Sequence, residues 1–177
     1  MVGETIRVEI RRSDPGARRT FALPRRASLV VLDLILAAAR EDPSLCYRYS
    51  CRSGYCGTCT VALDGHPVLA CRTPVPPGAR AVEIGPLPGF PIVRDLVVDV
   101  RPFTDRWAAA GGRLEPRAPA ATPTRSRRFV DEALDCISCG ACVAACDLSG
   151  ADRPFLGPAA LTRAMVVIAD ERTTDRR

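Results

Sequence analysis

The spacing of the cysteines constrains this chain more than any other feature of its sequence. Of the nine cysteines in 177 residues, eight form two short groups and Cys46 stands alone. The groups are Cys51, Cys56, Cys59 and Cys71, then Cys136, Cys139, Cys142 and Cys146. An odd number of cysteines in two tight groups does not fit a disulfide framework, so the pattern indicates metal or redox chemistry.

The first group has the spacing C-x4-C-x2-C followed by the distant Cys71. This is the plant-type ligand spacing for a [2Fe–2S] cluster. Gly54 and Gly57 carry no Cβ, so backbone N–H groups can approach the cluster sulfurs closely. A zinc site and buried free thiols are the alternative interpretations. Zinc sites favour paired C-x2–4-C knuckles, which this group lacks.

The second group has the spacing C-x2-C-x2-C-x3-C, typical of bacterial ferredoxins, with Asp147 where proline usually follows. In such runs the first three cysteines bind one cubane cluster and the fourth binds another. Cys136, Cys139 and Cys142 are therefore predicted as three ligands of a [4Fe–4S] cluster. Cys146 is predicted as a single ligand of a further cluster, and no cysteine follows it in the sequence.

Hydrophobic patterning around the first group predicts a small α+β domain. Strands are expected at Thr5–Arg12, Thr20–Leu23, Thr60–Leu63, Val68–Ala70 and Ala81–Ile84. Ser28 is predicted to cap a helix over Leu29–Arg40 that ends before Asp42-Pro43. An Asp64-Gly65 turn should bring the strand that precedes the fourth cysteine back along its neighbour.

A stretch rich in Ala, Gly, Pro and Arg separates the two groups of cysteines. Structureless segments of this length are uncommon inside a compact domain, so it is interpreted as a linker. The predicted organisation is a domain over 1–107, a linker over 108–126 and a smaller helical domain over 127–177. Helices are expected there at Arg127–Leu134 and Leu161–Ala169, with Gly157-Pro158 opening the second.

Composition excludes several classes of protein. The net charge is +5, but the arginines form no cluster, which argues against a nucleic-acid partner. Residues 1–9 lack the features of a secretory signal, so the chain is expected to stay in the reducing cytosol. The longest apolar stretch, 34–39, falls far short of the roughly 20 residues that a membrane span requires.

Five segments resemble the iron–sulfur subunits of succinate dehydrogenase and fumarate reductase. They are S-C-R-S-G-Y-C-G-T-C at 50–59, L-D-G-H-P-V-L-A-C-R-T at 63–73, P-I-V-R-D-L-V-V-D at 91–99, C-I-S-C-G-A-C at 136–142 and F-L-G-P-A-A-L at 155–161. The resemblance implies an N-terminal β-grasp [2Fe–2S] domain and a C-terminal all-helical domain with [4Fe–4S] and [3Fe–4S] clusters. It also implies a FAD-containing flavoprotein partner and a membrane anchor that binds quinone.

The same resemblance defines the expected role. Single electrons would pass between the flavoprotein and quinone, with the chain peripheral on the cytoplasmic face of the inner membrane and with no catalytic acid or base of its own. The family continues into a second group of cysteines that this sequence lacks. The helical domain is therefore expected to be truncated, its [4Fe–4S] cluster incompletely ligated and its [3Fe–4S] cluster doubtful.

Two other functions fit the residues. One is a stand-alone electron carrier that uses only the N-terminal [2Fe–2S] cluster. The other is a structural module in which zinc fills the cysteine sites. Iron content and co-purification with a flavoprotein distinguish these alternatives from the subunit of a complex.

Overall fold

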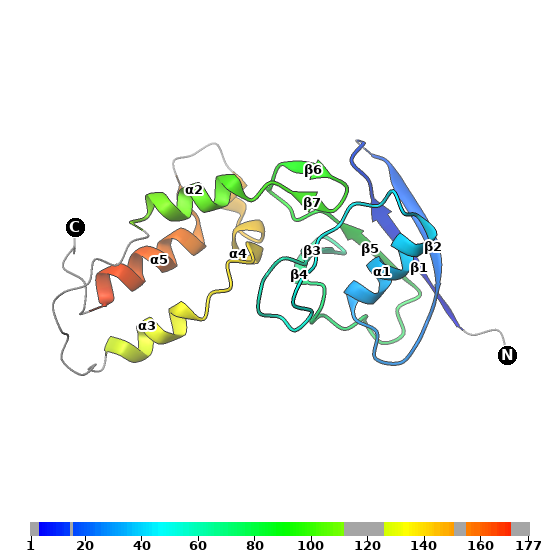
Figure 1. Cartoon of the computed structure of the whole chain (residues 1–177), viewed down its shortest axis with the longest axis horizontal. Helices are drawn as coiled ribbons and strands as arrows, with labels where there is room; N and C mark the ends of the chain where they lie inside the picture. The colour runs from blue at the N-terminus through cyan, green and yellow to red at the C-terminus, as the bar shows by residue number, and fades with distance from the viewer. Residues whose placement is uncertain (1–3, 15, 112–125, 151–154, 171–177) are drawn as a thin grey trace. The chain divides into compact units, whose positions relative to one another are not determined.

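The chain folds into two compact units, Met1–Asp99 and Val100–Arg177 (Figure 1). The computed structural model describes residues 4–14, 16–111, 126–150 and 155–170. The division falls eight residues before the predicted boundary at 107, because the helix that follows it packs within the second unit. Most of the predicted linker over 108–126 lies outside the described residues, so that part of the prediction stays a prediction.

A five-stranded mixed sheet forms the frame of the first unit, with the order β2-β1-β5-β3-β4. Its strands are β1 (Thr5–Arg11), β2 (Arg18–Pro24), β3 (Thr60–Leu63), β4 (His66–Leu69) and β5 (Ala81–Gly85). β1 pairs antiparallel with β2 and parallel with β5, whereas β3 runs antiparallel to both β5 and β4. All five predicted strands are present, with bounds that shift by two residues at most.

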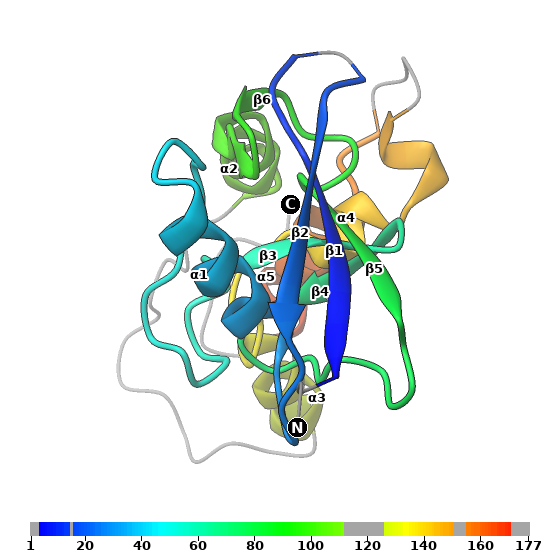
Figure 2. The same ribbon diagram turned by 90° about the vertical axis from the view of Figure 1, so that its right-hand side faces the viewer.

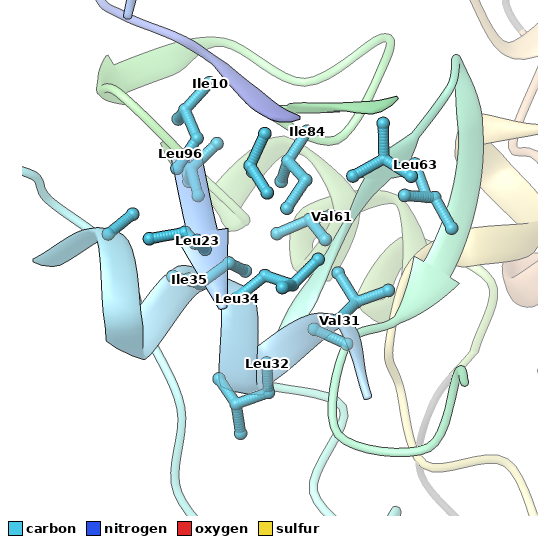
Figure 3. Close-up of a cluster of buried hydrophobic side chains, with 14 of the residues drawn as sticks. Ile10, Leu23, Val31, Leu32, Leu34, Ile35, Val61, Leu63, Ile84 and Leu96 are labelled. Carbon is cyan, nitrogen blue, oxygen red and sulfur yellow. The ribbon is translucent and has the colours of Figure 1, made fainter. Parts of the chain in front are cut away.

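Alternating apolar side chains place the core on one face of this sheet. Ile6, Val8 and Ile10 of β1 are fully buried, as the two-residue strand period requires. Helix α1 (Val31–Glu41) packs on that face beside β2 (Figure 2). Figure 3 shows side chains from α1, β1, β2, β3 and β5 meeting in one cluster. The result is an α+β unit.

Helix α1 begins two residues later than predicted, and Ser28 is not its N-cap. Ser28 has a left-handed φ of 63°, and Val30 is the residue at the cap. The N–H groups of Val31 and Leu32 instead donate to the backbone of the segment after β4, at 3.0 and 2.9 Å. The helix starts where this segment accepts hydrogen bonds from the first free N–H groups of the helix. A prediction from the nearest capping residue does not anticipate an acceptor that is distant in the sequence.

A short hairpin, β6 (Ile92–Arg94) with β7 (Val97–Val98), closes the first unit and was not predicted. Its turn contains Asp95, whose φ is 48° and whose side chain is buried. The Asp95 carboxylate accepts hydrogen bonds from the N–H and hydroxyl of Ser13, at 3.1 and 3.0 Å, and from the N–H of Cys46 at 2.8 Å. It also pairs with Arg12 at 3.1 Å. One carboxylate thus joins three loops.

Helices make up the described part of the second unit (Figure 1). They are α2 (Arg101–Ala109), α3 (Ser126–Leu134), α4 (Ala141–Ala144), the 3-10 turn η1 (Asp147–Gly150) and α5 (Pro158–Ala169). α5 contacts α2, α3 and α4, so it is the central helix of this unit. Both predicted helices are present, and α5 opens at Gly157-Pro158 as predicted, with Gly157 at its N-cap. α2 was not predicted.

Candidate functional site

The loop between α1 and β3 carries the first three cysteines of the N-terminal group. Cys51 is exposed, Cys56 is half-buried and Cys59 is buried at the start of β3. Positive φ angles occur at Arg52, Gly54 and Gly57, which alternate with residues of ordinary φ. Alternation of this kind turns successive backbone N–H groups toward one side and forms a concave anion site.

The fourth cysteine lies on the segment that leaves β4. Cys71 is buried, and the preceding Ala70 donates its N–H to the carbonyl of Cys59 at 3.2 Å. The carbonyl of Ala70 in turn accepts the N–H of Leu32 at 2.9 Å. The hairpin β3–β4 and the N-terminus of α1 therefore fix Cys71 beside Cys59.

The strongest interactions between the four thiols link them as two pairs. Cys51 lies in hydrogen-bonding contact with Cys56, and Cys59 lies in the same relation to Cys71. The charge of Cys56 also acts on Cys59, so the two pairs adjoin. Among the described residues, no three His, Cys, Asp or Glu side chains are arranged around a single metal ion.

The two pairs have opposite electrostatic surroundings. The N–H of Ser53, the thiol of Cys56 and the N–H of Tyr55 donate to the sulfur of Cys51 and lower its pKa to about 6. Burial, together with the thiols of Cys71 and Cys56, raises the pKa of Cys59 to about 11. The thiol of Cys51 therefore ionises more readily than an ordinary cysteine, whereas the thiol of Cys59 ionises less readily.

Gly54 is enclosed at the centre of this loop. Its φ is +85°, and a Cβ at that position would lie 2.8 Å from Cγ and 3.0 Å from Cδ of Arg72. The side chain of Arg72 thus lies directly on the Cα of Gly54. The position requires glycine for two reasons, the left-handed backbone and the lack of room.

We expect Gly54→Ala to weaken cluster retention, because the loop or the side chain of Arg72 must shift to admit the methyl group. The left-handed φ alone costs about 1–2 kcal/mol in a non-glycine residue. Iron release to a chelator, followed by visible absorbance, should be faster than in the unmodified protein. Gly78→Ala is the matched control, because Gly78 has a φ of +76° with no atom within 4 Å of a new Cβ. Equal release rates in the two variants would contradict the steric argument.

The second group of cysteines forms a separate loop that leads into α4. Cys136 and Cys139 act electrostatically on Cys142, whose pKa is raised first by loss of surrounding water and then by these two thiols. Ser138 and Gly140, on either side of Cys139, have positive φ angles of 53° and 76°. The second loop therefore shares positive φ angles with the first, and its first three cysteines lie near enough to influence one another electrostatically.

Cys146 has different neighbours. The hydroxyl of Ser149 is the main influence that lowers its pKa, and the N–H groups of Ser149 and Leu148 act in the same direction. Ser149 also accepts a hydrogen bond at its carbonyl from Arg106 of α2, at 3.2 Å. Cys146 thus sits at η1, where α2 and the end of the loop meet.

Sequence reasoning identified Gly54 and Gly57 but missed other residues that shape the two loops. Arg52 and Ser138 adopt left-handed φ in the two loops, and neither residue type signals that conformation. Asp95 was also missed, although aspartate is enriched at positive φ and a turn was a reasonable inference there. Cys46 lies outside both groups, as predicted, and its N–H binds Asp95.

Comparison with known proteins defines the class first. Residues 6–105 match the family described as "2Fe-2S iron-sulfur cluster binding domain". A chain of the Mycobacterium smegmatis Sdh1 complex in the apo form has the same fold, with a TM-score of 0.88 at 24% identity. That alignment covers 98% of this chain and 78% of the other. The class is thus an iron–sulfur protein with a [2Fe–2S] domain.

Curated relatives narrow the class. The fumarate reductase iron-sulfur subunit of Haemophilus influenzae is 33% identical over 86% of this chain and 67% of its own length. The succinate dehydrogenase iron-sulfur subunit of Paracoccus denitrificans is 36% identical over 81% of this chain and 58% of its own length. The mitochondrial iron-sulfur subunit 1 of Oryza sativa succinate dehydrogenase is 35% identical over 81% of this chain and 54% of its own length. The chain belongs to the iron–sulfur subunit family of succinate dehydrogenase and fumarate reductase, and it spans about half to two thirds of the length of these relatives.

Proposed function

We propose that this chain relays single electrons within a succinate:quinone oxidoreductase, either a succinate dehydrogenase or a fumarate reductase. One observation carries the proposal: the four thiols interact as two pairs, and the loop that holds three of them has positive φ at Arg52, Gly54 and Gly57. A zinc module requires one ion with four ligands around it, whereas two pairs fit a cluster with two irons. Family membership favours a subunit of a complex over a stand-alone carrier.

The pairing of the thiols suggests which residues share an iron. Cys51 and Cys56 would bind one iron of a [2Fe–2S] cluster, and Cys59 and Cys71 would bind the other. When bound, the cluster accepts and releases one electron at a time. The chain supplies thiolates, the N–H groups of Ser53 and Tyr55, and burial on the side of Cys59. No residue of this site has to act as an acid or base.

The second loop would hold a [4Fe–4S] cluster through Cys136, Cys139 and Cys142. A cubane cluster needs four ligands, so its fourth ligand has to come from outside this group. Cys146, apart from the other three, would be one ligand of a [3Fe–4S] cluster. In this proposal the first unit is a β-grasp ferredoxin domain and the second is part of a helical ferredoxin-type domain, with 108–126 joining them.

The partners proposed for the complex are a FAD-containing flavoprotein and a membrane anchor that binds quinone. Support comes from the names of the relatives, which are iron–sulfur subunits of enzymes that carry other subunits. The described part of this chain has no helix with the length and apolarity to cross a membrane. Attachment to the cytoplasmic face of the inner membrane would then depend on the anchor.

Iron analysis tests the proposal. Anaerobically purified chain should contain about two irons from the first site, and a reduced sample should give the EPR signal of a [2Fe–2S] cluster. Additional iron that is readily lost is expected from the second loop, because this group supplies only three cysteines to a cluster that needs four ligands. Stoichiometric zinc without iron after anaerobic reconstitution would contradict the proposal. Co-purification with a flavoprotein would separate the complex subunit from the carrier.

A further inference from the structure

Arg72 connects the two parts of the [2Fe–2S] site. It directly follows Cys71, and its N–H donates to the carbonyl of Leu69 at 2.9 Å, which fixes the backbone as it leaves β4. Its side chain crosses to the other ligand loop and covers Gly54, midway between Cys51 and Cys56. One side chain therefore touches the loop with two ligands while its backbone adjoins a third.

The contact is made by the stem of the arginine as well as by the start of its charged group. Relative to a Cβ built on Gly54, Cγ lies at 2.8 Å, Cδ at 3.0 Å and Nε at 3.5 Å. Nε is the first nitrogen of the guanidinium group, so the positively charged group lies next to the ligand loop at Gly54. Arg72 is exposed at its other atoms, so water and salt reach the charge.

A cluster gains one negative charge when it is reduced, and four thiolates already surround it. A fixed positive charge nearby stabilises the reduced state more than the oxidised state. Arginine suits this role because it stays protonated at any physiological pH. The ligand loop itself contributes backbone dipoles and Arg52, which directly follows Cys51.

We propose that Arg72 is a positioning residue that raises the reduction potential of the [2Fe–2S] cluster through its charge. The inference rests on the proposed function, because it requires the cluster in the first site. The stem that covers Gly54 holds the guanidinium at the ligand loop, and the charge then favours acceptance of an electron. Arg72 acts on the cluster through space and touches neither substrate nor flavin.

The test is an EPR-monitored redox titration of the full-length, cluster-loaded chain. Arg72→Gln removes the charge and keeps part of the stem, and we expect the equilibrium constant for reduction to fall about threefold to fivefold. A tenfold change corresponds to about 59 mV in a one-electron couple. Arg72→Lys should retain the potential of the unmodified protein. In 1 M salt the difference caused by Arg72→Gln should shrink, because the screening length falls to about 3 Å.

Arg80→Gln is the matched control, since it removes one exposed arginine next to β5. β3 runs antiparallel to β5 with Ala62 opposite Gly85, so Cys59 lies toward the end of β5 that is farther from Arg80. This variant should leave the potential unchanged. Equal potentials in Arg72→Gln, Arg80→Gln and the unmodified protein would overturn the proposal.

Cluster loss also decides the question. If Arg72→Gln fails to hold the cluster while Arg72→Lys holds it at the original potential, the charge is required and the proposal stands. If Arg72→Lys fails to hold it as well, the shape of the arginine matters rather than its charge, and the proposal is wrong. Absence of a [2Fe–2S] signal in the unmodified chain would contradict the proposed function instead.

Discussion

Replacement of Cys59 by Ser should abolish the [2Fe–2S] EPR signal or change it grossly. Cys59 is buried, interacts with Cys71 and directly precedes β3, so no other thiol can take its place without moving the sheet. A serine hydroxyl in that environment loses its proton far less readily than a thiol, and metal binding requires the deprotonated form. Iron content should fall below the roughly two irons per chain of the intact site.

Cys46→Ser provides the matched control for this result. Cys46 is half-buried and lies before the ligand loop, and its N–H, which the substitution retains, is the group that binds Asp95. The EPR spectrum and iron content of this variant should match those of the unmodified chain. An unchanged spectrum in Cys59→Ser would show that the ligand assignment is wrong. Circular dichroism should show that both variants are folded.

Asp95→Ala should lower the free energy of unfolding of the first unit by about 3 kcal/mol or more. The substitution leaves the N–H groups of Ser13 and Cys46 without their acceptor and removes a buried partner of Arg12. Loss of one member of a buried ion pair commonly costs about 3–5 kcal/mol. Urea denaturation at pH 7, followed by far-UV circular dichroism, measures the change. Asp95→Asn should lose less, because it keeps one acceptor and tolerates the left-handed φ.

Asp64→Ala is the control for the backbone term in this experiment. Asp64 has the same φ of 48°, but it is exposed and accepts one hydrogen bond, from the N–H of Glu83. Its replacement should therefore cost clearly less than that of Asp95. If the two losses are equal, the buried hydrogen-bond network around Asp95 contributes nothing beyond the strain of the turn.

The pH dependence of stability should identify the same carboxylate. Burial acts to raise the pKa of Asp95, but hydrogen bonds from Cys46 and Ser13 and the charge of Arg12 outweigh it and lower the pKa. A depressed pKa means that the folded state binds fewer protons than the unfolded state. This stabilisation is therefore complete above the unfolded pKa of about 3.9 and is lost as the pH falls through the folded value. Asp95→Asn should flatten the stability curve in that range.

The strands and helices that could be predicted are those in which local patterning and packing agree. The alternating apolar residues of β1 and the apolar residues of α1 are buried in the same core. The Asp64-Gly65 turn returns β4 along β3 in the same sheet, so local pattern and packing agree. The predicted start of α1 failed because a distant backbone segment, at 70–73, replaces the cap. β6, β7 and α2 were missed because they are short, and α2 follows a segment that carries no clear period.

The sequence by itself determined the family of this protein, which the comparisons confirm. Cysteine spacing also predicts which residues would share a cluster, because ligand spacing is a local property of a loop that wraps a cluster. The tertiary structure decided how those residues pair and what surrounds them. Cys71 meets Cys59 through the β3–β4 hairpin, Asp95 fixes the backbone at Cys46, and Arg72 covers Gly54. These contacts join residues that are 12 to 49 positions apart in the sequence. The left-handed backbone of the loops is not specified by residue type. Only the folded chain could therefore show these features.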